Sequence, residues 1–162
     1  MSSRFQAQRL AVLVDTAYVY AAARRLYDER LDYRRLLAFV ADGRPVVRAI
    51  AFVVRQGEAD VGPFVEALRA VGFEVRVRDR RRHLDGWRGE WDVGLALTAA
   101  ALAPRVDAVA LVAGSADFVD LLDHLEVAGT RAEVYAFAEA VDADLVDAAH
   151  DFRPLDGRLM LD

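Results

Sequence analysis

The sequence contains no cysteine and no lysine among its 162 residues. Without cysteine, the chain cannot form disulfide bonds, a thiolate nucleophile or a cysteine-ligated zinc or iron–sulfur centre. Without lysine, it cannot form a Schiff base or supply the lysine of a nucleotide-binding phosphate loop. The patterns GxGxxG, GxxxxGK[ST] and GxSxG are also missing, and the three histidines show no pairing at metal or triad spacing.

Long apolar runs are missing too, because charged residues interrupt each run well before the roughly 18 residues that a membrane-spanning helix needs. The N-terminus lacks the layout of a signal peptide, so we expect a soluble, cytoplasmic protein that engages no membrane. A length of 162 residues with 55% hydrophobic content predicts a single domain over residues 1–162. The net charge of −5 disfavours a general nucleic-acid coat but leaves a local basic patch open.

Apolar runs of strand length alternate with segments of helical period. This alternation predicts an α/β fold with one doubly wound, mainly parallel sheet between two helical layers, because parallel strands need crossover helices. The expected strands span residues 10–14, 46–54, 73–78, 108–112 and 132–137. The expected helices span residues 18–27, 32–41 (capped by Asp32), 63–71, 91–102, 117–127 and 142–150. Residues 79–90 are predicted to form a loop, and residues 152–161 to add a last strand or lie across an edge.

Acidic residues follow two of the expected strands, and they converge if the first and fourth strands are neighbours in the sheet. Asp15 directly follows the first strand with no obviously capped helix after it, and Asp117 lies just beyond the fourth strand. Ligands of open parallel sheets bind at the carboxyl ends of such strands. Asp92 is a third candidate, and three carboxylates suit Mg²⁺ or Mn²⁺. Purely structural explanations stay open: Asp117 could cap a helix, and Asp92 could simply favour the helix dipole.

An arginine-rich segment with interleaved tryptophans is the second informative feature. Such a segment offers phosphate neutralisation and stacking platforms, which single-stranded nucleic acid requires. The alternative is a solvated loop whose tryptophans pack on the domain or on a partner subunit. The candidate nucleic-acid-binding residues are Arg76, Arg78, Arg80, Arg81, Arg82, Trp87, Arg88 and Trp91.

Three blocks of the sequence, VLVDTAYVY, WDVGLALTAAAL and LVAGSADFVDLLDHLEVAGTRAEVYAF, appear in the order typical of one family. With them the chain resembles the NYN domain, a PIN-like nuclease fold, in its bacterial LabA-like branch. Asp15 matches the acid of the first block and Asp92 the first acid of the second. Gly114, Asp117 and Phe118 match the third block, which is the most specific of the three.

The resemblance implies a ribonuclease whose acidic cluster holds Mg²⁺ or Mn²⁺. The acidic set is nevertheless depleted here, because Thr98 replaces the second acid of the helix block. In the third block, the stretch of residues 113–117 has lost one acid and both serines, and Tyr18 replaces the asparagine of the first block. Asp15, Asp92 and Asp117 remain as candidate catalytic and metal-binding residues. Ser115, Thr98, Tyr18 and Gly114 are candidate supporting residues.

Three functions follow from these observations. The first is a slow metal-dependent ribonuclease that uses the three retained acids. The second is a pseudoenzyme that binds single-stranded RNA through the arginine-rich segment. The third is a regulatory protein-interaction module that forms a homo-oligomer, with Trp87 and Trp91 in the subunit interface.

Overall fold

The computed structural model describes residues 7–83, 86–88 and 90–162, with side chains described for residues 7–80 and 90–162. Its centre is one seven-stranded sheet with the order β4-β3-β2-β1-β5-β6-β7. Six strands pair in parallel, and only β4 is antiparallel, to β3. The strands are β1 (Leu10–Asp15), β2 (Val46–Gln56), β3 (Glu74–His83), β4 (Gly86–Arg88), β5 (Ala108–Val112), β6 (Arg131–Phe137) and β7 (Asp151–Leu155).

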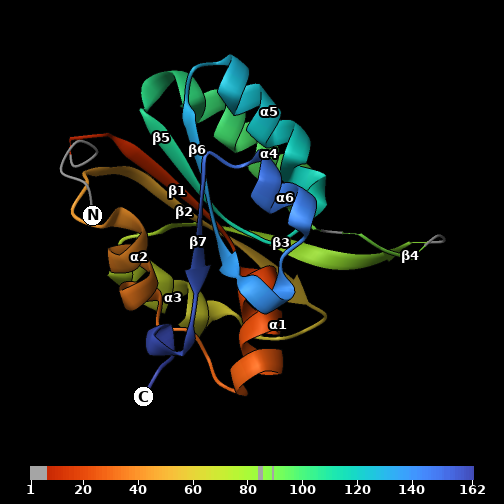
Figure 1. Cartoon of the computed structure of the whole chain (residues 1–162). Helices are drawn as coiled ribbons and strands as arrows, with labels where there is room; N and C mark the ends of the chain where they lie inside the picture. Colours follow the sequence, from red (N-terminus) through yellow and green to blue (C-terminus); the bar gives the residue numbers. More distant parts are fainter. Residues whose placement is uncertain (1–6, 84–85, 89) are drawn as a thin grey trace.

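Helices cover both faces of the sheet, as Figure 1 shows, so the predicted three-layer α/β architecture is confirmed. The side chains of β1 explain the two layers: all five residues from Leu10 to Val14 are fully buried, with alternate residues in the two separate hydrophobic cores. One face carries α1 (Thr16–Tyr27), α2 (Tyr33–Ala41) and α3 (Gly62–Val71). The other carries α4 (Asp92–Leu102), α5 (Val119–Val127) and α6 (Ala143–Ala148).

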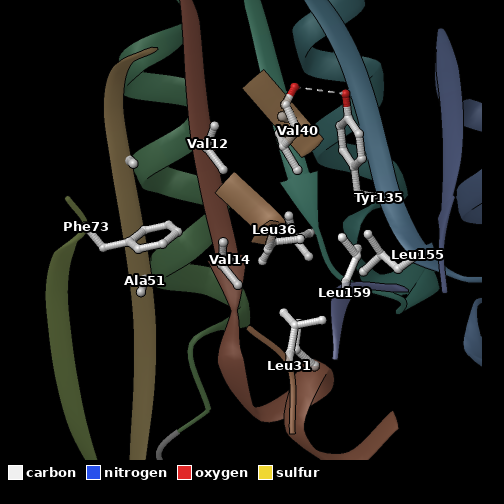
Figure 2. Close-up of a cluster of buried hydrophobic side chains, with 14 of the residues drawn as sticks. Val12, Val14, Leu31, Leu36, Val40, Ala51, Phe73, Tyr135, Leu155 and Leu159 are labelled. Carbon is white, nitrogen blue, oxygen red and sulfur yellow. Dashed lines mark hydrogen bonds between the residues drawn. The ribbon is translucent and has the colours of Figure 1, made fainter. Parts of the chain in front are cut away.

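Hydrophobic periodicity locates the helices and the buried strands closely. The expected helix at residues 32–41 is α2, and its predicted cap is confirmed, because the Asp32 carboxylate accepts hydrogen bonds from the backbone N–H groups of Arg34 and Arg35. The tail contributes a last strand, β7, which pairs with β6. Leu155, the last residue of this strand, and Leu159 beyond it pack into the core on the α2 face (Figure 2).

The prediction of a loop over residues 79–90 is wrong. Strand β3 continues to His83 and turns back as β4, which pairs with residues 81–83. The reason is the length of β2, which offers backbone partners to β3 as far as Gln56. Charge pairing between β2 and β3 also stabilises the extended strand, since Arg55 and Asp79 are register partners joined by two hydrogen bonds of 2.8 and 2.9 Å.

A buried ion pair joins α2 to the far half of the sheet. Arg44, after α2, donates to both carboxylate oxygens of Glu133 on β6, at 2.7 and 2.8 Å, and both side chains are at most 4% exposed. The hydroxyl of Tyr135 and the guanidinium of Arg131 donate to the same carboxylate. Burial tends to raise the pKa of Glu133, but these hydrogen bonds and the Arg44 charge hold it below its ordinary value. Figure 2 shows the Tyr135 hydroxyl beside the Val40 carbonyl at the end of α2.

No helix within the described ranges is both long enough and apolar enough to cross a membrane.

We expect Glu133→Gln to lower the free energy of unfolding by about 3–5 kcal/mol, because it leaves the Arg44 charge buried without its counter-ion. Urea denaturation at pH 7 measures this change. The matched control is Glu66→Gln, which removes the exposed Glu66–Arg69 pair and is expected to cost less than about 1 kcal/mol. Equal effects of the two variants would contradict the importance of the buried pair.

Candidate acidic site

The carboxyl ends of β1 and β5 lie side by side at the centre of the sheet. These two strands pair directly, with Val14 opposite Val112, although the chain leaves β1 toward β2 and β3. The first expected strand and the strand at residues 108–112 are therefore direct neighbours. This is the point where the strand order reverses, which is the usual place of a ligand in an open parallel sheet. Asp15 ends β1 here, and Asp117 follows β5.

Asp15 caps a helix, contrary to the sequence-based expectation that no capped helix follows it. Helix α1 begins at Thr16, and the Asp15 carboxylate accepts a hydrogen bond of 3.2 Å from the backbone N–H of Tyr18. Burial raises the pKa of Asp15 to about 6, and the negative charges of Asp92 and Glu90 contribute in the same direction. A carboxyl group with this pKa is mostly ionised at pH 7 and becomes protonated as the pH falls below 6.

Asp92 and Asp117 belong to the same electrostatic neighbourhood. Burial raises the pKa of Asp92, and the charges of Asp117 and Glu90 raise it further. Glu90 was not among the residues that the sequence analysis selected. In the sequence, its position two residues before Asp92 was the signal that could have indicated it. In the structure its side chain is exposed, and its negative charge raises the pKa of both Asp15 and Asp92.

The described carboxylates do not meet as a metal centre. Across residues 7–80 and 90–162, no three histidine, aspartate or glutamate side chains are gathered closely enough to hold an ion. Asp117 is exposed at the start of the α5 segment, whereas Asp15 is mostly buried and bound to the start of α1. The chemistry of the donors suits a hard cation, but their arrangement does not fit a site with three protein carboxylates.

Tyr18 occupies the space beside the strand ends. Its ring packs against both hydrophobic cores, and its hydroxyl accepts a hydrogen bond of 3.0 Å from the backbone N–H of Phe137, at the end of β6. Burial raises the pKa of Tyr18 to about 12, so this side chain is a neutral phenol. A Cβ atom on Gly114 would lie 2.3 Å from Cε1 of Tyr18 and 2.7 Å from the carbonyl oxygen of Ala140. Gly114 is thus required to admit the tyrosine ring.

The backbone N–H groups of the turn after β5 are hydrogen-bonded to side chains of the protein. Ser115, rather than Asp117, caps the 3₁₀ turn Ala116–Phe118, because its hydroxyl accepts a hydrogen bond from the backbone N–H of Asp117. The carboxylate of Asp142 accepts a hydrogen bond of 2.6 Å from the N–H of Ala116. Asp142 has no feature in the sequence that predicts this role. These amides would otherwise form an anion-binding helix start, and here side chains of the protein satisfy them.

Thr98 lies on the side of α4 that contacts β3, and not beside the acidic residues. Its hydroxyl donates to the Gly94 carbonyl within α4 and accepts a hydrogen bond of 2.8 Å from the guanidinium of Arg76. The same guanidinium lies 5.7 Å from the centre of the Phe52 ring. Arg76 and Thr98 therefore fasten α4 to the sheet.

Arg78 and Trp91 form a stack at the start of α4. The Arg78 guanidinium lies 3.9 Å from the centre of a Trp91 ring and donates to the Glu90 carbonyl. The indole N–H of Trp91 donates to the Val53 carbonyl, and its ring meets Phe52 edge-on. Trp91 is therefore half-buried against the domain, while Arg78 is exposed.

The remaining candidates for nucleic-acid binding lie at or beyond the end of the described part of β3. Arg80 is half-buried. The side chains of Arg81, Arg82, Trp87 and Arg88 lie outside the described residues, although their backbones form the β3–β4 hairpin.

Comparison with known proteins gives one family. The sequence model described as NYN domain matches residues 9–156. A crystal structure of a protein of unknown function from Vibrio parahaemolyticus is 31% identical, covers 99% of this chain and 100% of its own, and has a TM-score of 0.89. The nicotinamidase of Staphylococcus aureus is 15% identical over 88% of this chain and 89% of its own, with a TM-score of only 0.41. No curated protein matches significantly.

We expect Asp15→Asn to stabilise the protein at neutral pH. Because the pKa of Asp15 rises from 3.8 to about 6 on folding, ionising this carboxyl group costs stability, and the cost grows as the pH rises from 4 to 6. Asparagine keeps the helix cap without the charge. The variant should gain about 1–3 kcal/mol above pH 6 and nothing below pH 4.

Urea denaturation of the wild type and the variant at pH 4 and pH 7.5 measures this gain. Asp123→Asn, which changes an exposed acid on α5, is the control and should show no comparable gain. A variant that is less stable than the wild type at pH 7.5 would show that the Asp15 charge supports the fold.

Proposed function

This chain belongs to the NYN domain family, a PIN-like family of nuclease type, and from this premise we propose that it binds single-stranded RNA with weak or lost cleavage. In this proposal it is a pseudoenzyme or near-pseudoenzyme of the LabA-like branch. The three sequence blocks that contain Asp15, Asp92 and Asp117 support the branch assignment.

The packing of Tyr18 at the strand ends is the main support for weak or lost cleavage. Its ring lies against Gly114, and its hydroxyl is held by the N–H of Phe137, so this ring occupies space beside the ends of β5 and β6. The amides of Ala116 and Asp117 are likewise bound by Asp142 and Ser115. Groups that could otherwise bind a phosphodiester are thus engaged within the protein, which supports weak or lost hydrolysis at this place.

Nucleases of this family generally use divalent metal ions. For this chain we propose that Mg²⁺ or Mn²⁺ binds weakly or not at all, with Asp15, Asp92 and Asp117 as its only acidic ligands. One feature supports weak binding: within the described residues, no three acidic or histidine side chains are gathered closely enough to hold an ion. Affinity for hard cations follows the number and charge of the ligands.

The exposed edge formed by β3 and β4 is the proposed RNA surface. The arginine–tryptophan stack of Arg78 and Trp91 marks its start, beside the acidic residues. A planar guanidinium fixed on an indole offers both a positive charge and a flat face to an unpaired base. From there the hairpin continues with the sequence RRRHLDGWR, which adds four arginines and a second tryptophan.

We expect Arg78→Glu to weaken binding of single-stranded RNA roughly tenfold, because it replaces a phosphate-neutralising charge with a repulsive one. Fluorescence anisotropy with a labelled RNA at low and at physiological salt measures the affinity. The control is Arg69→Glu, an equal charge reversal at an exposed position of α3, which should change affinity little. Absence of RNA binding by the wild type at low salt would contradict the proposal.

We expect calorimetric titration of Mn²⁺ into the wild type to show no saturable binding tighter than about 1 mM. RNA cleavage with Mn²⁺ present should be near background and equal within about twofold in Asp15→Asn. Micromolar Mn²⁺ binding, together with cleavage that disappears in Asp15→Asn, would instead identify a working ribonuclease.

A further inference from the structure

Two arginines on one face of β3, Arg76 and Arg78, have different surroundings. The guanidinium of Arg76 is half-buried, donates to the Thr98 hydroxyl and lies over the Phe52 ring. Arg78 is two positions further along the strand, on the same face. It stays exposed, and its Nη1 donates to the Glu90 carbonyl at 2.8 Å. The charge and the planar group of Arg78 are therefore accessible to a ligand, whereas those of Arg76 are engaged within the domain.

The indole of Trp91 covers one face of the Arg78 guanidinium, with 3.9 Å between the guanidinium carbon and the ring centre. Trp91 is itself fixed by several contacts. Its N–H donates to the Val53 carbonyl at 2.9 Å, and its ring meets Phe52 edge-on with the ring centres 5.2 Å apart. Its backbone carbonyl accepts a hydrogen bond of 2.6 Å from the N–H of Leu95, in the first turn of α4. The indole thus holds the guanidinium at a defined place.

Gly94 leaves room for this indole. A Cβ atom at Gly94 would lie 2.8 Å from Cε3 and 3.1 Å from Cζ3 of Trp91, and 3.5 Å from Nη2 of Arg78. The first of these distances is too short for real atoms, so a side chain at position 94 would push the indole from its place. Alanine would suit the helix backbone better than glycine. What Gly94 provides is therefore space for the stack of Trp91 and Arg78.

A fixed guanidinium with one covered face is suited to an unpaired nucleobase. Bases of single-stranded RNA stack on aromatic rings and on the planes of arginine side chains. In a duplex each base is paired and lies between its neighbours, so that no base face is open to the protein. A flat group on the protein therefore distinguishes single-stranded from double-stranded RNA, whereas a positive charge alone attracts the phosphates of both.

We propose that Trp91 and Gly94 are positioning residues, and that the Arg78 guanidinium that they hold takes one unpaired base on the face turned away from the indole. This contact gives the protein a preference for single-stranded over double-stranded RNA. The inference rests on the proposed function and adds which group touches the base, since Trp91 acts through Arg78. The alternative is that the stack only fastens the start of α4 to β3, and the following experiments separate the two roles.

Arg78→Lys keeps the positive charge and removes the planar group. Fluorescence anisotropy measures the affinity of this variant for a labelled oligouridine of about ten nucleotides and for an RNA duplex of similar length, at several salt concentrations. We expect the affinity for the single strand to fall about fivefold to tenfold and that for the duplex to stay within about twofold, with unchanged salt dependence. The control is Arg69→Lys, the same exchange at an exposed position of α3, which should leave both affinities unchanged.

Gly94→Ala tests the positioning without changing the residue that touches the RNA. The added methyl group displaces the indole, so we expect the affinity for the single strand to fall at least about threefold, with the duplex affinity within about twofold of the wild type. Urea denaturation shows that the variant is folded. In a Trp87→Phe background, Trp91 is the only tryptophan, and its fluorescence emission reports the displacement.

The outcomes distinguish failure of this inference from failure of the proposed function. A wild type that binds the duplex as tightly as the single strand overturns the inference and leaves RNA binding in place. Equal changes of the two affinities in Arg78→Lys, or no change in either, do the same. A Gly94→Ala variant with altered Trp91 emission and full single-strand preference excludes the positioning role. A wild type that binds neither RNA at low salt removes the proposed function and this inference together.

Discussion

Parallel pairing of β1 with β5 at the middle of the sheet is the constraint on which the rest of the structure depends. Both strands are buried on both faces, and each hydrogen-bonds along its whole length to the other. Because the chain runs outward from β1 in one direction and from β5 in the other, the two strand ends meet where helices on opposite faces begin. Asp15 and Asp117 are therefore neighbours by topology, whatever chemistry they serve.

Where the ends of β1 and β5 meet, polar groups of the protein form hydrogen bonds with one another. Asp15 caps α1, Ser115 and Asp142 hold the turn after β5, and Tyr18 fills the remaining space. Each contact is ordinary in isolation. Together they show a scaffold of the NYN family in which polar groups at the strand ends are bound within the protein. Among the described residues, exposed charge lies further out, at Arg78 on β3 and at Glu90 before α4.

Much of the fold was predictable because burial imposes a period on the sequence. The buried runs of β1 and β5 and the Asp32 cap of α2 follow from local rules of packing and hydrogen bonding. The hairpin was missed because its arginines alternate with other charges, and its stability depends on backbone partners and on the Arg55–Asp79 pair, which are contributed by a strand distant in sequence. For the same reason the sequence could indicate Asp15 and Asp92, but not their separation, nor the influence of Glu90.

The ion pair of Arg44 with Glu133 has a consequence for local opening of the native protein. Its partners are 89 positions apart in the chain, so the pair holds the end of α2 against β6, on the far half of the sheet. A motion that separates α2 from β6 must break this buried pair and leave both charges without their partners, which costs free energy. The pair thus limits how often the interior of the protein is opened to proteases.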